Sequence, residues 1–290
     1  MKKNLTRLQK ELIQDQKNEI DAYHVYSRLA KKTKDGHNKE ILQSIASDEK
    51  KHYNIIREYT NQEVKPSNIK IVFYIFLARL LGFTFALKLL EKAEKKAQVA
   101  YKKIGETYPK LEKITRDEER HELDLINMMN EERLEYMGSV VLGLNDALVE
   151  LTGALAGFTF ALQNSKIIGV LGLITGIAAS LSMGASEYLS SKHEQHKNPG
   201  KAASYTTIAY VVTVFLLIIP FVLVGDPFVS LIFTVIIAII IIAIFNYYVS
   251  VAKDFSFKKR FIEMASISLG VAGASFLIGV LVKTTLGVGI

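Results

Sequence analysis

The chain has 290 residues, no cysteine and a formal net charge of +7 at pH 7. Without cysteine there are no disulfides, iron–sulfur clusters, Cys-ligated zinc sites or rubredoxin-type iron centres, so metals would need carboxylate, imidazole or thioether ligands. The lysines are spread over the chain with no aromatic-interleaved basic patch, so we expect no nucleic-acid partner.

The composition divides the chain into two regions. Residues 1–136 hold most of the charge, and long apolar runs dominate residues 137–290. Runs of eighteen or more apolar residues are typical of transmembrane helices. The sequence therefore predicts an all-α protein with two domains, a four-helix bundle followed by a five-helix transmembrane domain.

Apolar residues at helical spacing predict the four bundle helices, with turn signals at Asp35-Gly36, Pro66, Gly105 and Pro109. The expected helices cover about 4–34, 38–61, 84–105 and 110–136.

Residues 69–90 are apolar enough to suggest a further membrane span, but they carry Lys70, Arg79 and Lys88. A crossing here would put the first two and the last two bundle helices on opposite sides of the membrane. We interpret the segment as the long crossover of the bundle, which can lie on the membrane surface.

A pattern D-E-x-x-H occurs twice, beginning at Asp48 and at Asp117. Residues three apart lie on one helix face, so each Glu and its His can reach one metal ion. Each copy follows a frame E-x-x-A-x-x-x-Y, and bundles with two E-x-x-H helices and one Glu from each of two others build di-metal sites. One E-x-x-H arises easily by chance, but this tandem arrangement does not. The predicted ligands are Glu19, Glu49, His52, Glu94, Glu118 and His121.

Glu91 shares a helix face with Glu94. Glu94 is the better ligand because its distance from the turn matches that of Glu118, and Glu91 remains an extra or shifting ligand. Carboxylate and imidazole groups suit iron or manganese, so we expect a di-iron site that can also take manganese.

Five spans are expected, joined by two basic and two nearly uncharged loops. The positive-inside rule then places the bundle and both basic loops in the cytoplasm and the C-terminus outside, in the cell membrane. The charged start, with no apolar run, predicts no cleavable signal peptide. The expected spans are about 138–162, 167–190, 204–225, 228–251 and 263–288.

Asp146 and Glu150 lie four residues apart in the middle of the first span. A charged carboxylate there costs about 2.5–3.5 kcal/mol on insertion scales, so the pair predicts a cation or proton path, the alternative being a pair that only packs against a neighbouring helix. Met183 and Glu187 have the same spacing in the second span. A thioether with a carboxylate suits Fe²⁺, although a lone Met is more often filler.

The linker after the second span carries His193, Glu194 and His196. These residues are a candidate shallow metal-collecting site. A cluster of this composition is more often just a solvated linker.

The motif Asn145-Asp146-Ala147-Leu148-Val149-Glu150, the run Leu181–Leu189 and the five spans resemble the vacuolar iron transporter family, and residues 1–136 resemble the rubrerythrin/ferritin-like superfamily. Their fusion is similar to the membrane-bound ferritin group. The resemblance implies a dimeric Fe²⁺ or Mn²⁺ exporter driven by proton exchange, with Asp146 and Met183 on the path. Thr175 stands where the family often has a carboxylate, and the linker is short, so metal capture falls to the bundle.

We therefore expect a transporter that exports Fe²⁺ or Mn²⁺ in exchange for protons, with a bundle that captures the metal. The alternative is a membrane-anchored di-iron ferroxidase or peroxide-scavenging oxidase. A third interpretation is a metal sensor in which the bundle gates the pore.

Overall fold

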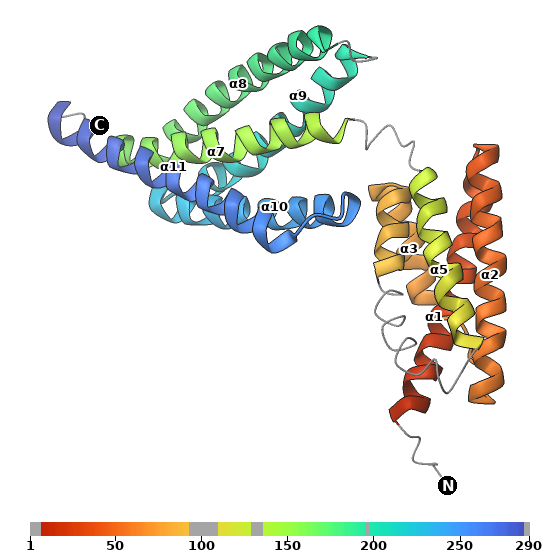
Figure 1. Cartoon of the computed structure of the whole chain (residues 1–290). Coiled ribbons are helices and arrows are strands. Elements are labelled where there is room, and N and C mark those ends of the chain that lie inside the picture. The colour runs from red at the N-terminus through yellow and green to blue at the C-terminus, as the bar shows by residue number, and fades with distance from the viewer. Residues whose placement is uncertain (1–6, 93–109, 129–135, 195–197, 287–290) are drawn as a thin grey trace. The chain divides into compact units, whose positions relative to one another are not determined.

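A computed structural model describes residues 7–92, 110–128, 136–194 and 198–286. The described residues form helices and no strands, which confirms the all-α prediction. Figure 1 shows the helices along the chain. They are α1 (Arg7–Lys32), α2 (Gly36–Thr60), α3 (Asn68–Leu81), α5 (Lys110–Asn127), α7 (Met137–Leu162), α8 (Ser165–His193), α9 (Pro199–Leu223), α10 (Pro227–Ala252) and α11 (Phe257–Leu286).

The chain separates into two compact units, Met1–Glu131 and Glu132–Ile290. In the first unit, α1 packs along α2. Helix α1 also contacts α3, and α2 also contacts α5. The break between α1 and α2 lies where the sequence predicts it, but its residues act differently from our expectation. Asp35 caps α2, since its side chain accepts a hydrogen bond of 2.8 Å from the Asn38 amide, and Gly36 is the first residue of α2.

The crossover predicted over 69–90 is divided into two helical pieces. It consists of α3 and a second helical stretch at 83–92, separated by Gly82. Gly82 has a φ of 99°, which residues with a Cβ rarely adopt. The glycine therefore allows the chain to turn between the two pieces.

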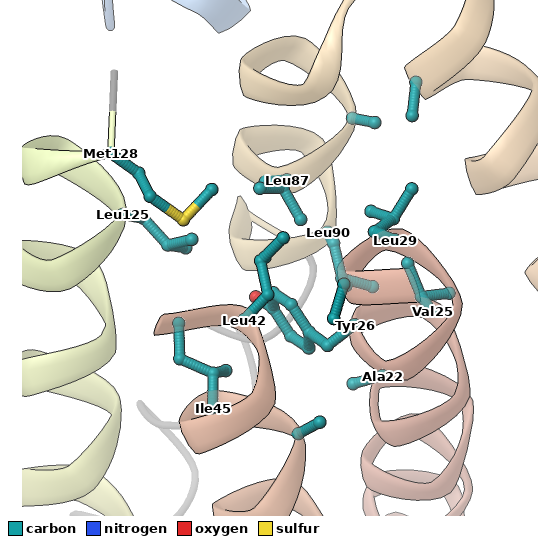
Figure 2. Close-up of a cluster of buried hydrophobic side chains, with 14 of the residues drawn as sticks. Ala22, Val25, Tyr26, Leu29, Leu42, Ile45, Leu87, Leu90, Leu125 and Met128 are labelled. Atoms are coloured by element: carbon teal, nitrogen blue, oxygen red, sulfur yellow. The ribbon is translucent and has the colours of Figure 1, made fainter. Parts of the chain in front are cut away.

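Apolar side chains from all described parts of the bundle meet in one core. Figure 2 shows Tyr26 and Leu42 beside Leu90, with Leu125 and Met128 of the α5 end on the other side of the cluster. Burial of these side chains supplies the main driving force for packing the bundle helices. It also fixes the rotation of α1, α2 and α5 about their axes, which decides where their polar inner residues point.

The fourth bundle helix is described only over the first part of its predicted length. α5 ends at Asn127, whereas we expected a helix over 110–136. Residues 129–135 of that prediction lie outside the described residues, as do residues 93–105 of the predicted third helix.

Among the described residues, five helices are long and apolar enough to cross a membrane, α7 to α11. The prediction of a five-helix transmembrane domain is confirmed in the length and composition of these helices. α7 packs against each of the other four. At Gly143 an added Cβ would collide with the Thr206 carbonyl group, so a glycine is needed for the close approach of α7 and α9.

Candidate metal centre

The inner faces of three bundle helices bring five predicted ligands together. Glu19 comes from α1, Glu49 and His52 from α2, and Glu118 and His121 from α5. Each of these residues is at most 6% exposed. Because Glu and His are three apart on both α2 and α5, the apolar packing that orients each helix turns both side chains inward.

The distances show how the glutamates are shared. His52 Nδ1 lies 3.1 Å from Glu118 Oε1, 3.5 Å from Glu19 Oε2 and 3.8 Å from Glu49 Oε2. His121 Nδ1 lies 3.3 Å from Glu49 Oε1 and 3.6 Å from Glu118 Oε2. Glu49 and Glu118 thus face both imidazoles, as glutamates that bridge two ions would.

One ligand atom from each of Glu19, Glu49, His52 and Glu118 lies within 4.8 Å of the others. Such a spacing allows one cation to reach all four residues. His121 faces the far oxygens of Glu49 and Glu118, on the side where a second ion would lie.

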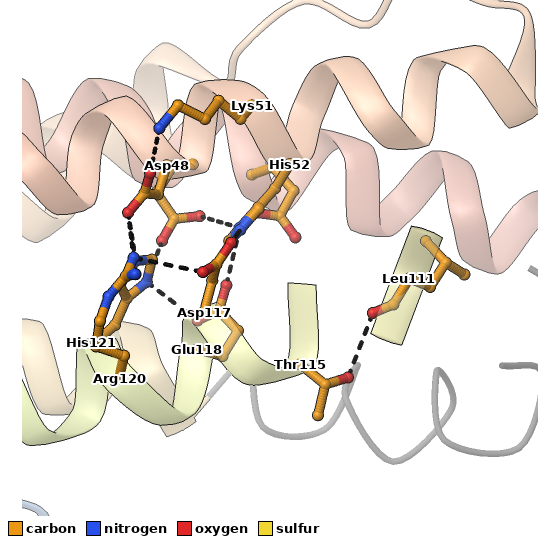
Figure 3. Close-up of polar contacts among 11 residues, drawn as sticks. Asp48, Lys51, His52, Leu111, Thr115, Asp117, Glu118, Arg120 and His121 are labelled. Atoms are coloured by element: carbon orange, nitrogen blue, oxygen red, sulfur yellow. Dashed lines mark hydrogen bonds and ion pairs between the residues drawn. The ribbon is translucent and has the colours of Figure 1, made fainter. Parts of the chain in front are cut away.

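The Asp that opens each D-E-x-x-H motif contacts the histidine of the other motif. Asp117 Oδ2 lies 3.3 Å from His52 Nε2, and Asp48 Oδ2 lies 3.4 Å from His121 Nε2 (Figure 3). Carboxylates behind metal-binding imidazoles fix the ring orientation and the tautomer. Sequence reasoning found these Asp residues only as part of the repeat and missed this role.

Two cations hold Asp48 in place. Arg120 Nη2 lies 2.5 Å from Asp48 Oδ2, and Lys51 Nζ donates to Asp48 Oδ1 at 2.7 Å. Burial raises the pKa of Asp48, but its contacts with Lys51 and His121 outweigh that effect and lower the pKa. Asp48 therefore stays ionised behind His121.

Without a metal, the two histidines carry the positive charge of the cluster. Burial alone would lower their pKa values, but the close contacts of Glu118 and its neighbouring glutamates with the imidazoles outweigh it. The pKa of His52 is raised, and that of His121 is raised to about 10. Binding of a metal has to displace these protons.

Glu19 and Glu49 titrate differently from each other. Burial, and then the charge of Glu49, raise the pKa of Glu19 well above its usual value. Burial also raises the pKa of Glu49, but the close ion-pair contacts with His121 and His52 outweigh it and lower the pKa to about 2. Glu49 is therefore the carboxylate best prepared to meet a cation.

Several buried polar atoms of the cluster lack a hydrogen-bond partner among the described residues. They are Glu19 Oε2, both carboxylate oxygens of Glu49, and Nδ1 of His52 and His121. Buried carboxylate oxygens without partners are costly, and a cation coordinated by them removes that cost. Carboxylate oxygens with imidazole nitrogens suit iron or manganese, so the residues fit the expected metal.

The remaining predicted bundle ligands are placed only in part. Glu94 lies outside the described residues. Glu91 belongs to the helical stretch 83–92, and its Oε1 atom is buried. The ligand roles of Glu91 and Glu94 stay predictions.

In the membrane unit, α7 carries Asp146 and Glu150. The Tyr210 hydroxyl of α9 donates a hydrogen bond of 3.0 Å to Glu150 Oε2, while much of Glu150 is exposed on the surface of the single chain. Tyr210 itself is fully buried. Sequence reasoning missed Tyr210, although a hydroxyl in the middle of an apolar span is a signal that could have found it.

Met183 and Glu187 have different surroundings on α8. Met183 is half-buried and packs against the apolar core of the spans. Glu187 Oε1 accepts hydrogen bonds from Ser139 of α7 at 2.6 Å and from Ser191 at 3.3 Å. Glu187 thus connects α8 to the first turn of α7.

Comparisons with known proteins now identify both units. Residues 137–197 match the model of the VIT family, and residues 3–60 and 15–133 match the Rubrerythrin model. The chain joins a rubrerythrin domain to a VIT family domain. No curated protein matches it. The VIT family implies metal-ion transport, and the rubrerythrin domain implies di-iron binding.

The matched ranges contain the residues of both predicted sites. The rubrerythrin match covers every predicted bundle ligand from Glu19 to His121, and the VIT match covers Asp146, Glu150, Met183 and Glu187. The predicted ligands and the predicted path residues thus lie within the matched ranges, and their roles stay predictions.

The described linker residues, His193 and Glu194, belong to no group of side chains spaced to hold a metal. His193 ends α8 and is exposed, and Glu194 accepts a hydrogen bond of 3.1 Å from Ser190. His196 lies outside the described residues. Within the described part of the chain, the one group of acidic and histidine side chains spaced to hold a metal is in the rubrerythrin domain.

Proposed function

We propose that this protein exports Fe²⁺ or Mn²⁺ from the cytoplasm in exchange for protons, and that the rubrerythrin domain captures the metal. The observation that carries the proposal is the acidic pair of α7, Asp146 and Glu150, in a VIT family domain attached to a buried carboxylate–histidine cluster. We assign the capture of the metal ion to residues 1–136 and its transport across the membrane to residues 137–290.

The depth of the acidic pair supports a transport role. Glu150 is thirteen residues from Met137 in α7, or about 20 Å along the helix axis at 1.5 Å per residue. This distance places it well within a hydrocarbon layer about 30 Å thick. Carboxylates at such depth mark ion and proton paths, and each can hold either a proton or a share of a metal ion's charge. Alternating occupancy by these two would couple metal export to proton entry.

The exposure of Glu150 supports a homodimer. In the single chain, Glu150 is exposed at mid-span although Tyr210 bonds one of its oxygens. Lipid contact at this position would be costly. A second copy of the chain covering this face of α7 would instead enclose the acidic pair in a protein-lined path.

The basic loops support the proposed orientation. Lys192, Lys197 and Lys201 lie around the linker between α8 and α9, and Lys258, Lys259 and Arg260 follow α10. Both loops are on the same side of the membrane as the start of α7, to which the rubrerythrin domain is joined. The positive-inside rule makes that side cytoplasmic.

The rubrerythrin match favours a second candidate, a membrane-anchored di-iron ferroxidase or peroxide-scavenging oxidase. Two bound iron ions would supply oxygen or peroxide chemistry. Glu49 and Glu118 would hold both ions, Glu19 would complete one side, and Asp48 and Asp117 would keep the imidazoles oriented. An anchored oxidase would leave Asp146 and Glu150 without a function.

Uptake of Fe²⁺ and Mn²⁺ by proteoliposomes, with and without an imposed pH gradient, tests the proposal. We expect gradient-dependent flux in the wild-type protein and its loss in Asp146→Asn. Glu263→Gln, an exposed carboxylate near the start of α11, is the matched control and should keep the flux. Normal flux in Asp146→Asn would refute the assigned path, and oxygen consumption without any flux would favour the anchored oxidase.

A further inference from the structure

Helix α3 carries a stripe of exposed apolar side chains on its outer face. The stripe consists of Ile69 (84% exposed), Val72 (59%), Phe73 (50%), Phe76 (57%) and Leu80 (57%). Their spacing places all five on one side of the helix. A contiguous apolar surface of this kind on a soluble domain marks an interaction site.

The opposite face of α3 is firmly packed. Ile71 is fully buried and Ala78 is 7% exposed, and both belong to the core cluster of the bundle. Ser67, just before α3, donates its amide to Asp21 Oδ1 at 2.5 Å. The bundle therefore holds the helix in a rotation that leaves the stripe facing outward.

Cationic side chains border the stripe on both edges. At 100° per residue, Lys70 lies about 100° to one side of Ile69 and Arg79 about 80° to the other. Both are exposed, although Lys70 Nζ also lies 3.8 Å from Asp21 Oδ2. An apolar strip with cations along its edges suits a bilayer surface, where the strip enters the acyl boundary and the cations meet lipid phosphates.

The position of α3 in the bundle suits the same surface. Ile71 and Ala78 share their core cluster with Leu125 and Met128, at the end of α5 that leads to the membrane spans. Only residues 129–136 separate this end from α7, and a segment of that length reaches at most about 30 Å. This short connection keeps the bilayer within reach of the stripe, so docking does not require a separate encounter in solution.

We propose that α3 docks on the bilayer that holds the spans, with the stripe in the interface and Lys70 and Arg79 at the level of the phosphates. A second copy of the chain fits this face less well. A two-fold pair of antiparallel α3 helices would bring Lys70 of one copy near Arg79 of the other, and these like charges repel each other. The docking needs the spans as an anchor and does not depend on which ion they pass.

Spin-label accessibility in the full chain tests the docking directly. Because the chain has no cysteine, Val72→Cys and Asn54→Cys can each be labelled at one position. Asn54, exposed on α2, is the matched control. The labelled proteins are placed in nanodiscs of phosphatidylcholine and phosphatidylglycerol, and collision rates with oxygen and with a polar nickel complex are measured.

We expect the ratio of the oxygen collision rate to the nickel collision rate to be several-fold higher at Val72 than at Asn54. The reason is that oxygen enters hydrocarbon and the nickel complex does not. Adding Phe76→Glu, at an exposed position, should bring the Val72 ratio down to that of Asn54. Equal ratios at the two labels in the parent protein would overturn the proposal. So would a Val72 label shielded from both reagents, which would show that protein, such as a second copy, covers the stripe.

Discussion

Acidic side chains are arranged in opposite ways in the two units of this chain. In the rubrerythrin domain, Glu19, Glu49 and Glu118 converge with two histidines, and several of their polar atoms have no hydrogen-bond partner among the described residues. In the VIT family domain, Glu150 and Glu187 lie on different helices, and hydroxyl groups of neighbouring helices bind each of them.

This difference in arrangement is the one expected between a site that holds an ion and a path that lets an ion pass. Converging ligands that lack other partners bind a cation firmly, and protons occupy the cluster until a cation arrives. Spaced carboxylates with hydroxyl partners offer several weaker positions, which an ion can enter and leave. Substitutions in each unit test whether the two groups of carboxylates work independently.

The largest effect is expected from Glu49→Gln. Glu49 faces both histidines and is fully buried, so the change removes a ligand shared by two ions. We expect the bundle to lose metal binding in calorimetric titration with Fe²⁺ or Mn²⁺. Glu58→Gln, on the exposed side of the same helix, should bind as the wild type does. Wild-type binding by Glu49→Gln would contradict the shared-ligand assignment.

Asp117→Asn should weaken metal binding by about 10–100-fold without abolishing it, the usual effect of removing a carboxylate behind a ligand imidazole. The Asp117 carboxylate lies 3.3 Å from His52 Nε2, so the amide would leave His52 less firmly oriented and less basic. The same titration measures the change. An affinity equal to that of the wild type would show that the crossed Asp–His contacts do not support the site.

Gly143→Ala should lower the free energy of unfolding by about 1–3 kcal/mol, the usual cost of overpacking. An added Cβ at Gly143 would meet the Thr206 backbone, whereas one at Gly270 meets nothing within 4 Å in the single chain. Unfolding in mixed micelles compares Gly143→Ala with Gly270→Ala as its control. Equal stability of the two variants would argue against the close packing of α7 and α9.

The last prediction concerns the pH dependence of the metal-free protein. The pKa of His121 is about 10 in the folded chain and about 6.5 when unfolded, so its stabilising proton is fully effective below pH 6.5 and is lost as pH rises towards 10. In a calorimetric scan, the unfolding transition whose melting temperature rises when metal is added is that of the bundle. Its melting temperature should fall between pH 6.5 and 10, and the fall should be smaller in His121→Gln. An unchanged melting temperature over that range would contradict the charged state of the cluster.

The sequence predicted what depends on local periodicity. Glu49 and His52 share a face because they are three residues apart, and the apolar runs are long enough for spans, so both follow from helix geometry alone. The contacts of Asp117 with His52 and of Tyr210 with Glu150 depend on how separate helices are placed against each other. No local pattern determines that placement.

Residues 69–90 show the same limit. Their composition suggested either a span or a crossover, and the positions of Ile71 and Ala78 could not be assigned to the bundle from periodicity alone. The packed structure shows which side of α3 is buried and that Ile69 and Phe76 face outward. It also shows that Gly82 divides the segment, which depends on a backbone angle rather than on hydropathy.

Bound metal and flux measured on the same proteoliposomes test the separation of holding from passing most directly. The account predicts that Glu49→Gln loses the bound metal but keeps gradient-driven flux at saturating metal, whereas Asp146→Asn keeps the bound metal and loses the flux. Loss of both properties together in either variant would contradict the account, because the two groups of carboxylates would then act as one site.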